Sequence, residues 1–403
     1  MSTSPSPGHV TPPKGLILVI GLVSMIGPFS IDTYLPSFPA IAQGLGVGLP
    51  ALAQTLSIYL VAFAAATLVW GPLSDRFGRR PTLLVSLSLF IVASIGCALA
   101  ESYATLMMWR ACQGAFACGG MVIGRAVVRD VYAGAMAQRA MSHVMLVFAA
   151  APALAPVIGG WLESLFGWRS VFLFLALFGL FAVVLVFRGL PETHPQAARH
   201  SIHPRSVGTN YLRVLRHGRF LALVAALSLG FGGLFLYISG SPALIYDHLG
   251  LGEGDFGWFV IPAVAGMMAG SWLSGRIAHS WSPLNILKLG FAVLGVAFIA
   301  NLLDALWSTP GLFSVVAPLV LYAFGVTLVI PVLTVQALDC FPHNRGMASA
   351  VQSFAQMSFN AVVAGFLMPL TASSLVYMAL AQGLLLCASV LIMWKTSVRP
   401  HVH

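Results

Sequence analysis

Residues 71–81 read Gly71-Pro72-Leu73-Ser74-Asp75-Arg76-Phe77-Gly78-Arg79-Arg80-Pro81, a short and charge-dense stretch. It separates two apolar segments, 51–71 and 82–100, each about as long as a helix that crosses a bilayer. Because Gly71 and Gly78 permit tight turns, the stretch predicts a loop at a membrane boundary that can lock two helices together and release them. A simple positively charged membrane anchor is the alternative.

The composition extends this pattern to the whole chain. Of its 403 residues, 59% are hydrophobic and only 8% are charged, whereas a soluble globular protein carries about 25% charged residues. At about 20 apolar residues per span, the hydrophobic residues suffice for about twelve spans. The sequence therefore predicts an all-α polytopic membrane protein and excludes a secreted enzyme, a nucleic-acid-binding domain and a disordered scaffold.

Hydropathy places the twelve expected transmembrane helices in two groups of six. They lie at 15–42, 51–71, 82–100, 104–127, 138–162, 169–189, 218–240, 255–279, 284–303, 311–337, 346–370 and 374–394. The only long polar connection, 190–217, contains four arginines and three prolines and predicts a linker between bundles 15–189 and 218–394, with tails 1–14 and 395–403. Leu73-Ser74-Asp75-Arg76 and Leu273-Ser274-Gly275-Arg276 occupy matching places in the two halves, which supports two pseudo-symmetric bundles.

The distribution of positive charge predicts the orientation. Seventeen of the twenty Lys and Arg residues fall on the side of the N-terminus, and only Arg169 falls near the other side. Excess Lys and Arg mark cytoplasmic loops. We therefore expect both tails and the linker in the cytoplasm, and we attribute the net charge of +9 to this asymmetry rather than to nucleic-acid binding.

Neither cysteines nor histidines point to a cofactor. All five cysteines fall within or at the ends of apolar stretches, so no disulfide framework is expected. The eleven histidines show no spacing typical of a metal site. We expect no metal, no organic cofactor and no enzymatic activity, and residues 1–13 lack the features of a signal peptide.

Four further motifs accompany residues 71–81. They are Arg110-Ala111-Cys112-Gln113-Gly114, Ala151-Pro152-Ala153-Leu154-Ala155-Pro156-Val157-Ile158-Gly159-Gly160, Ile31-Asp32-Thr33-Tyr34-Leu35-Pro36, and Arg125-Ala126-Val127-Val128-Arg129-Asp130-Val131-Tyr132. Together they resemble the major facilitator superfamily, and the last two resemble its Bcr/CflA branch of drug:proton antiporters. The resemblance covers the whole chain, although Ala155 and Gly275 replace an expected glycine and an expected acid.

The resemblance implies the major facilitator fold, a location in the bacterial inner membrane and roles for two groups of residues. Asp130 is implied to pair with the loop that carries Arg79 and Arg80; ordinary interfacial anchoring is the alternative. The implied cytoplasmic latch comprises Gly71, Asp75, Arg76, Gly78, Arg79, Arg80, Arg125, Arg129 and Asp130. Pro152, Pro156, Gly159 and Gly160 form the implied antiporter motif, which can also be a packing kink.

Asp32 and Arg110 are the charges placed deepest in the first half, at roughly comparable depth. A carboxylate inside the membrane indicates a functional site. Because burial favours the protonated form and a nearby arginine favours the ionised form, the pair is expected to exchange a proton. A static ion pair between spans one and four is the alternative.

Polar and aromatic residues on several spans are candidates to line a substrate path. Gln352, Gln356 and Asn360 recur every fourth residue and share one face of span eleven, which is expected to face a cavity or another helix. The other candidates are Tyr34, Tyr59, Phe63, Gln113, Phe235 and Tyr237, each of which can instead serve packing.

Two functions fit these features. The first is proton-coupled export of an amphiphilic compound such as an antibiotic by a monomeric transporter. The alternative is a dedicated exporter or importer of one metabolite, such as a siderophore or an amino-acid derivative. Few charges lie deep within the spans, chiefly Asp32, Arg110 and Arg125, which favours broad and mostly hydrophobic recognition.

Overall fold

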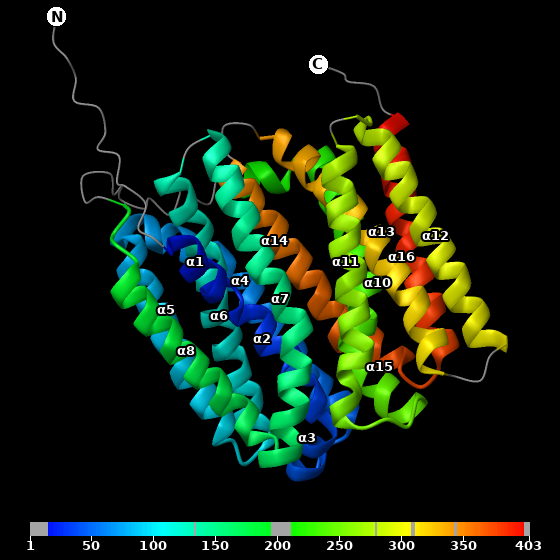
Figure 1. Ribbon diagram of the computed structural model, residues 1–403, viewed down its shortest axis with the longest axis horizontal. Coiled ribbons are helices and arrows are strands. Elements are labelled where there is room, and N and C mark those ends of the chain that lie inside the picture. Colours follow the sequence, from blue (N-terminus) through cyan, green and yellow to red (C-terminus); the bar gives the residue numbers. More distant parts are fainter. Residues whose placement is uncertain are drawn as a thin grey trace, which may run out of the picture.

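The computed structural model is an all-helical bundle (Figure 1) that describes residues 15–132, 134–194, 211–278, 280–307, 311–341 and 345–398. Within these residues the chain forms no β-strand. Twelve helical segments are long and apolar enough to cross a membrane, as the hydropathy predicted. They are Leu16–Leu45, Leu49–Phe77, Arg79–Ala98, Tyr103–Val131, Arg139–Phe166, Arg169–Gly189, Gly218–Ser239, Glu253–Ile277, Pro283–Trp307, Leu312–Asp339, Arg345–Thr371 and Leu375–Lys395.

The first six segments form one bundle. Its first segment consists of α1 (Leu16–Ser24), α2 (Ile26–Asp32), η1 (Leu35–Ser37) and α3 (Phe38–Leu45); the others are α4 (Leu49–Phe77), α5 (Arg79–Ala98), α6 (Tyr103–Val131), α7 (Gly134–Phe166) and α8 (Arg169–Gly189). Helix α4 packs against α6, and α5 packs against both α6 and α8.

The last six segments form the second bundle. They are α10 (Gly218–Ser239); α11 (Phe256–Ile277), preceded by η3 (Ala243–His248) and η4 (Glu253–Asp255); α12 (Pro283–Trp307); α13 (Leu312–Asp339); α14 (Arg345–Val362), continued by η5 (Val363–Leu367) and α15 (Met368–Thr371); and α16 (Leu375–Val398). Helix α13 packs against α11 and α12, and α10 packs against α16.

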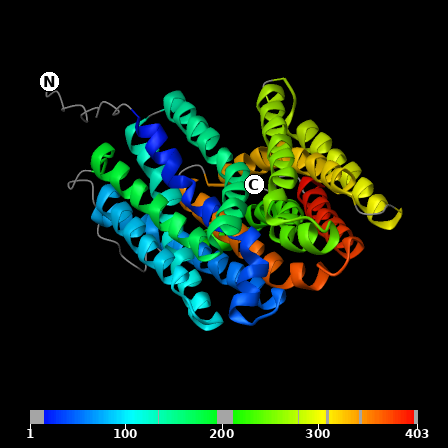
Figure 2. The same cartoon turned by 60° about the horizontal axis from the view of Figure 1, so that its bottom comes forward.

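The two bundles meet along α14 and α4 and along α11 and α7. Figure 2 shows α14, in orange, lying against the blue helices of the first half. Because the helices alternate in direction, the start of α1 and the end of α16 lie on the same side of the bundle. We call this side the terminal side and the opposite side, where α4 begins, the distal side.

The first span is a broken helix. Helix α1 ends at Ser24, four residues before Pro28, and α2 begins at Ile26, two residues before it. Proline lacks an N–H and clashes with the carbonyl four residues earlier, which is that of Ser24. A second interruption follows Asp32, where Pro36 lies in η1. The segment that carries Asp32 is therefore a single short helix and not part of one continuous helix.

The expected loop at 71–81 is corrected by the structure. Helix α4 continues to Phe77 and α5 begins at Arg79, so Gly78 alone separates them. Gly78 has a φ of 101°, which favours glycine. Gly71 lies inside α4 and makes no turn, and a Cβ added there would only reach ordinary contact with Val122. Hydropathy placed the end of the second span at residue 71, before the end of the helix, because charged residues can continue a helix beyond the apolar layer.

Candidate functional site

A charge cluster joins four segments of the first half on the terminal side. Its centre is Arg79, whose Nε donates to Asp130 Oδ2 at 2.8 Å and whose Nη1 donates to Ser74 Oγ at 2.7 Å and to Asp75. The side chain of Arg79 is 8% exposed and that of Asp130 is 21% exposed, whereas Asp75 is 57% exposed. The cluster therefore ties α6 to the junction between α4 and α5 through a largely buried ion pair.

Glu192 belongs to this cluster, although the sequence analysis did not single it out. Its carboxylate accepts the backbone N–H groups of Arg79 at 2.9 Å and of Arg80 at 3.3 Å. Thr193 adds a bond to Asp130 at 3.3 Å, and Arg80 donates to the carbonyl of Phe187 at 2.6 Å. A carboxylate at the start of a helix is favourable because the first N–H groups have no partner within the helix. The sequence feature that could have identified it is an acidic residue only three positions after the expected end of span six.

Arg110 is completely buried inside the first half. Its guanidinium carbon lies 4.5 Å from the ring centre of Tyr34 and 4.3 Å from that of Tyr59. Nη1 donates to the Ser30 carbonyl at 3.1 Å and to Gln113 Oε1 at 2.6 Å, and Gln113 in turn donates to Ser94 at 2.9 Å. Two aromatic faces and two oxygens thus surround the charge, and the site joins spans one to four.

The structure does not bring Asp32 and Arg110 into an ion pair. Ser30 and Tyr34 contact Arg110, and Asp32 lies two residues from each, about 200° around a helix. Asp32 is 8% exposed, and no group in the described chain forms a hydrogen bond or ion pair with its carboxylate. The expected pairing of these two residues is therefore absent in this conformation, and Asp32 is a buried acid without a partner.

The two glycines of the candidate antiporter motif contact backbone on either side of α7. A Cβ on Gly159 would overlap the carbonyl of Thr33, the residue after Asp32. A Cβ on Gly160 would overlap the carbonyl of Glu253, in the second half. Pro152 and Pro156 both lie inside α7, which continues to Phe166. Helix α7 thereby connects the segment beside Asp32 to the boundary between the halves.

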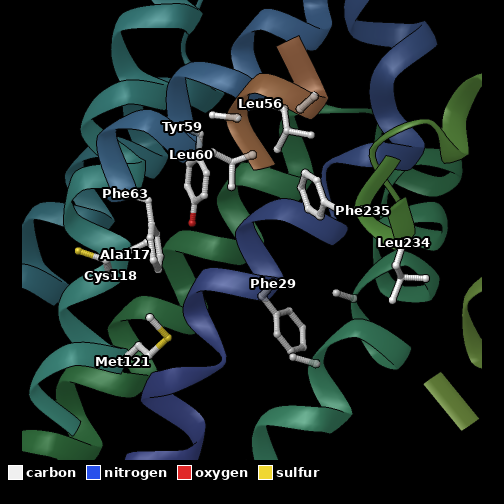
Figure 3. Packing of buried hydrophobic residues seen from close by; sticks show 14 of the residues in the cluster. Phe29, Leu56, Tyr59, Leu60, Phe63, Ala117, Cys118, Met121, Leu234 and Phe235 are labelled. Atoms are coloured by element: carbon white, nitrogen blue, oxygen red, sulfur yellow. The ribbon is translucent and has the colours of Figure 1, made fainter. Parts of the chain in front are cut away.

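The predicted path-lining residues do not come together in one site. Tyr34, Tyr59 and Gln113 surround Arg110 within the first half, and Tyr237 accepts a hydrogen bond from Asn301 at 2.6 Å within the second half. Phe63 and Phe235 are both 4% exposed, and Figure 3 shows them in one apolar cluster with Phe29 and Leu56. Gln352 donates to Thr334 at 3.1 Å, and the side-chain oxygen of the buried Asn360 has no partner in the described chain, while Gln356 is half-buried on the same helix.

Polar contacts close the boundary between the halves near the distal side. Ser57 donates to the carbonyl of Ala361 at 2.8 Å, and Gln54 donates to that of Gly365. Tyr246 donates to the carbonyl of Pro36 at 2.7 Å. Together with the contact between Gly160 and Glu253, these bonds hold the distal ends of the bundles together.

A cavity of about 260 Å³ lies between the halves on the terminal side. Its lining comes from α4, α6, α7, α13 and α14 and includes Arg125, Arg129 and Arg345. Closed distal contacts and a cavity on the terminal side describe a conformation that is accessible from the terminal side. Arg125 and Arg129 line this cavity, whereas Asp130 pairs with Arg79 in the charge cluster. The residues expected to form one latch therefore belong to two separate sites.

Two bundles of six helices, a boundary closed at one end and charged groups buried within the spans define a polytopic membrane protein of the transporter class. The chain belongs to the Major Facilitator Superfamily, which its residues 20–365 match. A bicyclomycin resistance protein homolog of Haemophilus influenzae is 31% identical, over 72% of this chain and 73% of that protein. A chloramphenicol resistance protein of Pseudomonas aeruginosa is 30% identical, over 83% and 79%. Multidrug resistance protein D of Escherichia coli is 28% identical, over 83% and 84%.

Solved structures share the fold at lower identity. The human organic anion transporter MFSD10 has a TM-score of 0.67 and 19% identity, and the alignment covers 97% of this chain and 99% of that chain. A POT family transporter in complex with a thioalcohol-conjugated peptide has a TM-score of 0.75 and 14% identity, over 96% and 98%. The expected fold of two six-helix bundles is confirmed, and the protein is a multi-pass membrane protein of a transporter family.

Proposed function

We propose that the protein is a proton-coupled secondary transporter that exports amphiphilic drugs or antibiotics from the bacterial cytoplasm by alternating access. The names of the relatives, which refer to bicyclomycin, chloramphenicol and multidrug resistance, support this substrate class. The terminal side is then the cytoplasmic side of the inner membrane, the cavity is the cytoplasmic entrance, and the protein acts as a monomer without a cofactor.

The observation that carries the proposal is the unpartnered Asp32. An ionised carboxylate without a partner is unfavourable in a buried position, so the inward-facing conformation favours its protonated form. A conformation that exposes Asp32 to water on the distal side favours proton exchange there. One acid that changes protonation with the access of the transporter is sufficient to couple a proton to substrate movement.

Arg110 positions the acid rather than pairing with it. It fixes Ser30 and Tyr34 on either side of Asp32, and the carbonyl of Thr33 packs on Gly159 of α7. Because Gly160 contacts Glu253 of the second half, a movement of the segment that carries Asp32 reaches the distal boundary through α7. This provides a physical route from protonation to the opening of the distal side.

Everted vesicles that contain a fluorescent proton probe test the proposal. Chloramphenicol and ethidium are added as test substrates while a pH gradient is maintained. Wild-type vesicles are expected to release protons when substrate is added, and Asp32→Asn vesicles are expected to lose this response while retaining some binding of neutral substrates. Asp304→Asn, an acid near the distal end of α12, is the matched control and is expected to behave like wild type.

Two results would contradict the proposal at different levels. Proton release like that of wild type from Asp32→Asn vesicles would show that Asp32 is not the coupling residue, and Asp130 and Glu163 would then be tested. The absence of both proton release and gradient-dependent export from wild-type vesicles, over a panel of neutral, cationic and anionic drugs, would overturn proton-coupled drug export.

A further inference from the structure

The cavity on the terminal side contains three positive charges and no negative charge. Arg125 and Arg129 of α6 and Arg345 of α14 line it. All eleven acids of the chain lie in the described residues, and none of them lines this cavity. Of the three arginines, Arg345 has an acidic partner outside the lining. It pairs with Asp339 at 2.7 Å, and the two side chains are 60% and 54% exposed.

Arg125 and Arg129 have no partner for their charges. Neither forms a hydrogen bond or ion pair within the described chain, and the two guanidinium groups repel each other. They are one helical turn apart, which places Arg125 about 6 Å deeper from the terminal side than Arg129. Arg79, at a similar level, has two acids and a serine as partners. An arginine that anchors a helix end faces lipid headgroups or water, whereas these two face the boundary between the halves.

The remaining walls complement an amphiphilic ligand. Met121, Val122, Met141 and Leu338 supply apolar surface, and Thr67, Ser349 and Ser353 supply hydroxyl groups. Apolar walls with a few convergent polar groups are typical of small-molecule sites. Arginine binds carboxylate, sulfonate and phosphate groups through two parallel hydrogen bonds.

We propose that this cavity binds the anionic group of an amphiphilic molecule at Arg125 and Arg129, with the apolar part of the molecule against Met121, Met141 and Leu338. The inference rests on the proposed function and deepens it, because it adds amphiphiles with a carboxylate, sulfonate or phosphate group to the neutral and cationic drugs of the proposed class. The start of α14 lies beside the site, since a Cβ on Gly346 would be 2.8 Å from Arg129 Nη1. A bound anion therefore offsets the repulsion among the arginines when α6 and α14 approach each other.

The test uses two probes of nearly equal shape and different charge. Calorimetry measures the affinity of the purified full-length protein in a neutral detergent for 2-naphthalenesulfonate and for the uncharged 2-naphthalenesulfonamide. Wild type is expected to bind the sulfonate at least tenfold more tightly, which corresponds to about 1.4 kcal/mol, and this preference is expected to decrease as salt is added.

Variants assign the preference to the cavity. Arg125→Gln and Arg129→Gln are each expected to bring the affinity ratio toward one, whereas Arg125→Lys, which keeps the charge, retains most of the preference. Arg276→Gln is the matched control, because Arg276 lies at the same membrane boundary but stacks on Trp272 outside the cavity. It is expected to leave the ratio unchanged. If Arg125→Gln does not fold, Arg129→Gln at its more exposed position gives the same test.

A wild-type protein that fails to bind the sulfonate, or binds both probes equally, overturns the proposal. An unchanged ratio in the folded glutamine variants also overturns it. Nanodiscs with phosphatidylglycerol or phosphatidylcholine distinguish the two sources of the anion. Competition by phosphatidylglycerol that depends on Arg125 identifies a lipid headgroup as an occupant, and the absence of competition identifies a small molecule. The binding experiment needs no pH gradient, so its failure is distinguishable from the failure of proton-coupled export.

Discussion

Arg110 carries its charge in the interior of the first half, and its neighbours explain how the charge is tolerated there. The ring centres of Tyr34 and Tyr59 lie 4.5 Å and 4.3 Å from its guanidinium carbon, and two oxygens accept bonds from Nη1, while Nε and Nη2 have no hydrogen-bond partner in the described chain. A planar guanidinium fits between two rings, whereas a lysine ammonium is compact and more strongly hydrated. Arg110 is therefore a positioning residue that holds the broken first span against α4 and α6.

Replacement of this arginine is expected to destabilise the protein more than removal of a neighbouring hydroxyl. Arg110→Lys loses the stacking on two rings, each worth about 0.5–2 kcal/mol, and its apparent unfolding temperature in detergent should decrease by several degrees. Tyr59→Phe keeps the ring and loses the hydroxyl, which donates to the Gly27 carbonyl at 3.3 Å, so it should unfold close to wild type. Equal unfolding temperatures for Arg110→Lys and wild type would contradict this role.

The two acids that contact Arg79 differ in exposure, and their removal should differ accordingly. Asp130 is 21% exposed and Asp75 is 57% exposed. Asp130→Asn is expected to lower stability by about 1–3 kcal/mol because it leaves a largely buried arginine with a weaker partner, whereas the effect of Asp75→Asn should stay within about 1 kcal/mol. Thermal unfolding at low and high salt checks the order. A larger loss for Asp75→Asn would contradict this account of the cluster.

Sequence reasoning identified the individual charges but not their partners. Depth along a span can be counted from the sequence, and Asp32 and Arg110 were placed at comparable depth on that basis. The direction of a side chain around its helix cannot be obtained in this way, because the breaks at Met25 and after Asp32 change the phase of the first span. The resemblance to a known family implied the contact of Asp130 with the junction of α4 and α5, where it pairs with Arg79.

At the scale of elements, α7 is the connection between the candidate coupling acid and the distal boundary. Its Gly159 contacts the chain beside Asp32 and its Gly160 contacts the second half, so the two adjacent glycines serve different contacts. The sequence indicated these glycines as part of an implied antiporter motif or of a packing kink. It did not predict the partners, because packing between distant segments depends on the folded arrangement of both halves.

Gly160→Ala is expected to open the distal boundary. The added methyl group would overlap the Glu253 carbonyl, which lies in backbone that has to move. With Ser57→Cys in a background without native cysteines, Gly160→Ala should increase labelling from the distal side severalfold, because Ser57 is part of the distal contact. Gly254→Ala, where an added Cβ meets nothing within 4 Å, is the control. Unchanged labelling in Gly160→Ala would show that this contact does not hold the boundary closed.

At the scale of the whole molecule, the sequence predicted which segments span the membrane but not which side is accessible. Hydropathy depends on the same apolar faces in either conformation, so it cannot distinguish them. The structure places the closing contacts at Ser57, Gln54, Tyr246 and Gly160, all toward the distal side. It places the arginine-lined cavity toward the terminal side. These features together define a conformation that is open toward the terminal side, which the proposed mechanism uses as its inward-facing state.

The orientation of this state in the membrane is the remaining step, and it can be tested directly. The expected topology assigns seventeen of the twenty Lys and Arg residues to the side of the N-terminus, and positively charged loops stay in the cytoplasm. In a background without the five native cysteines, a membrane-impermeant maleimide should label Glu101→Cys, in the exposed connection between α5 and α6, in intact cells. It should label Ser201→Cys, in the expected linker, only after the cells are permeabilised. Labelling of Ser201→Cys in intact cells would reverse the topology, and the arginine-lined cavity would then face the outside and admit substrate from there.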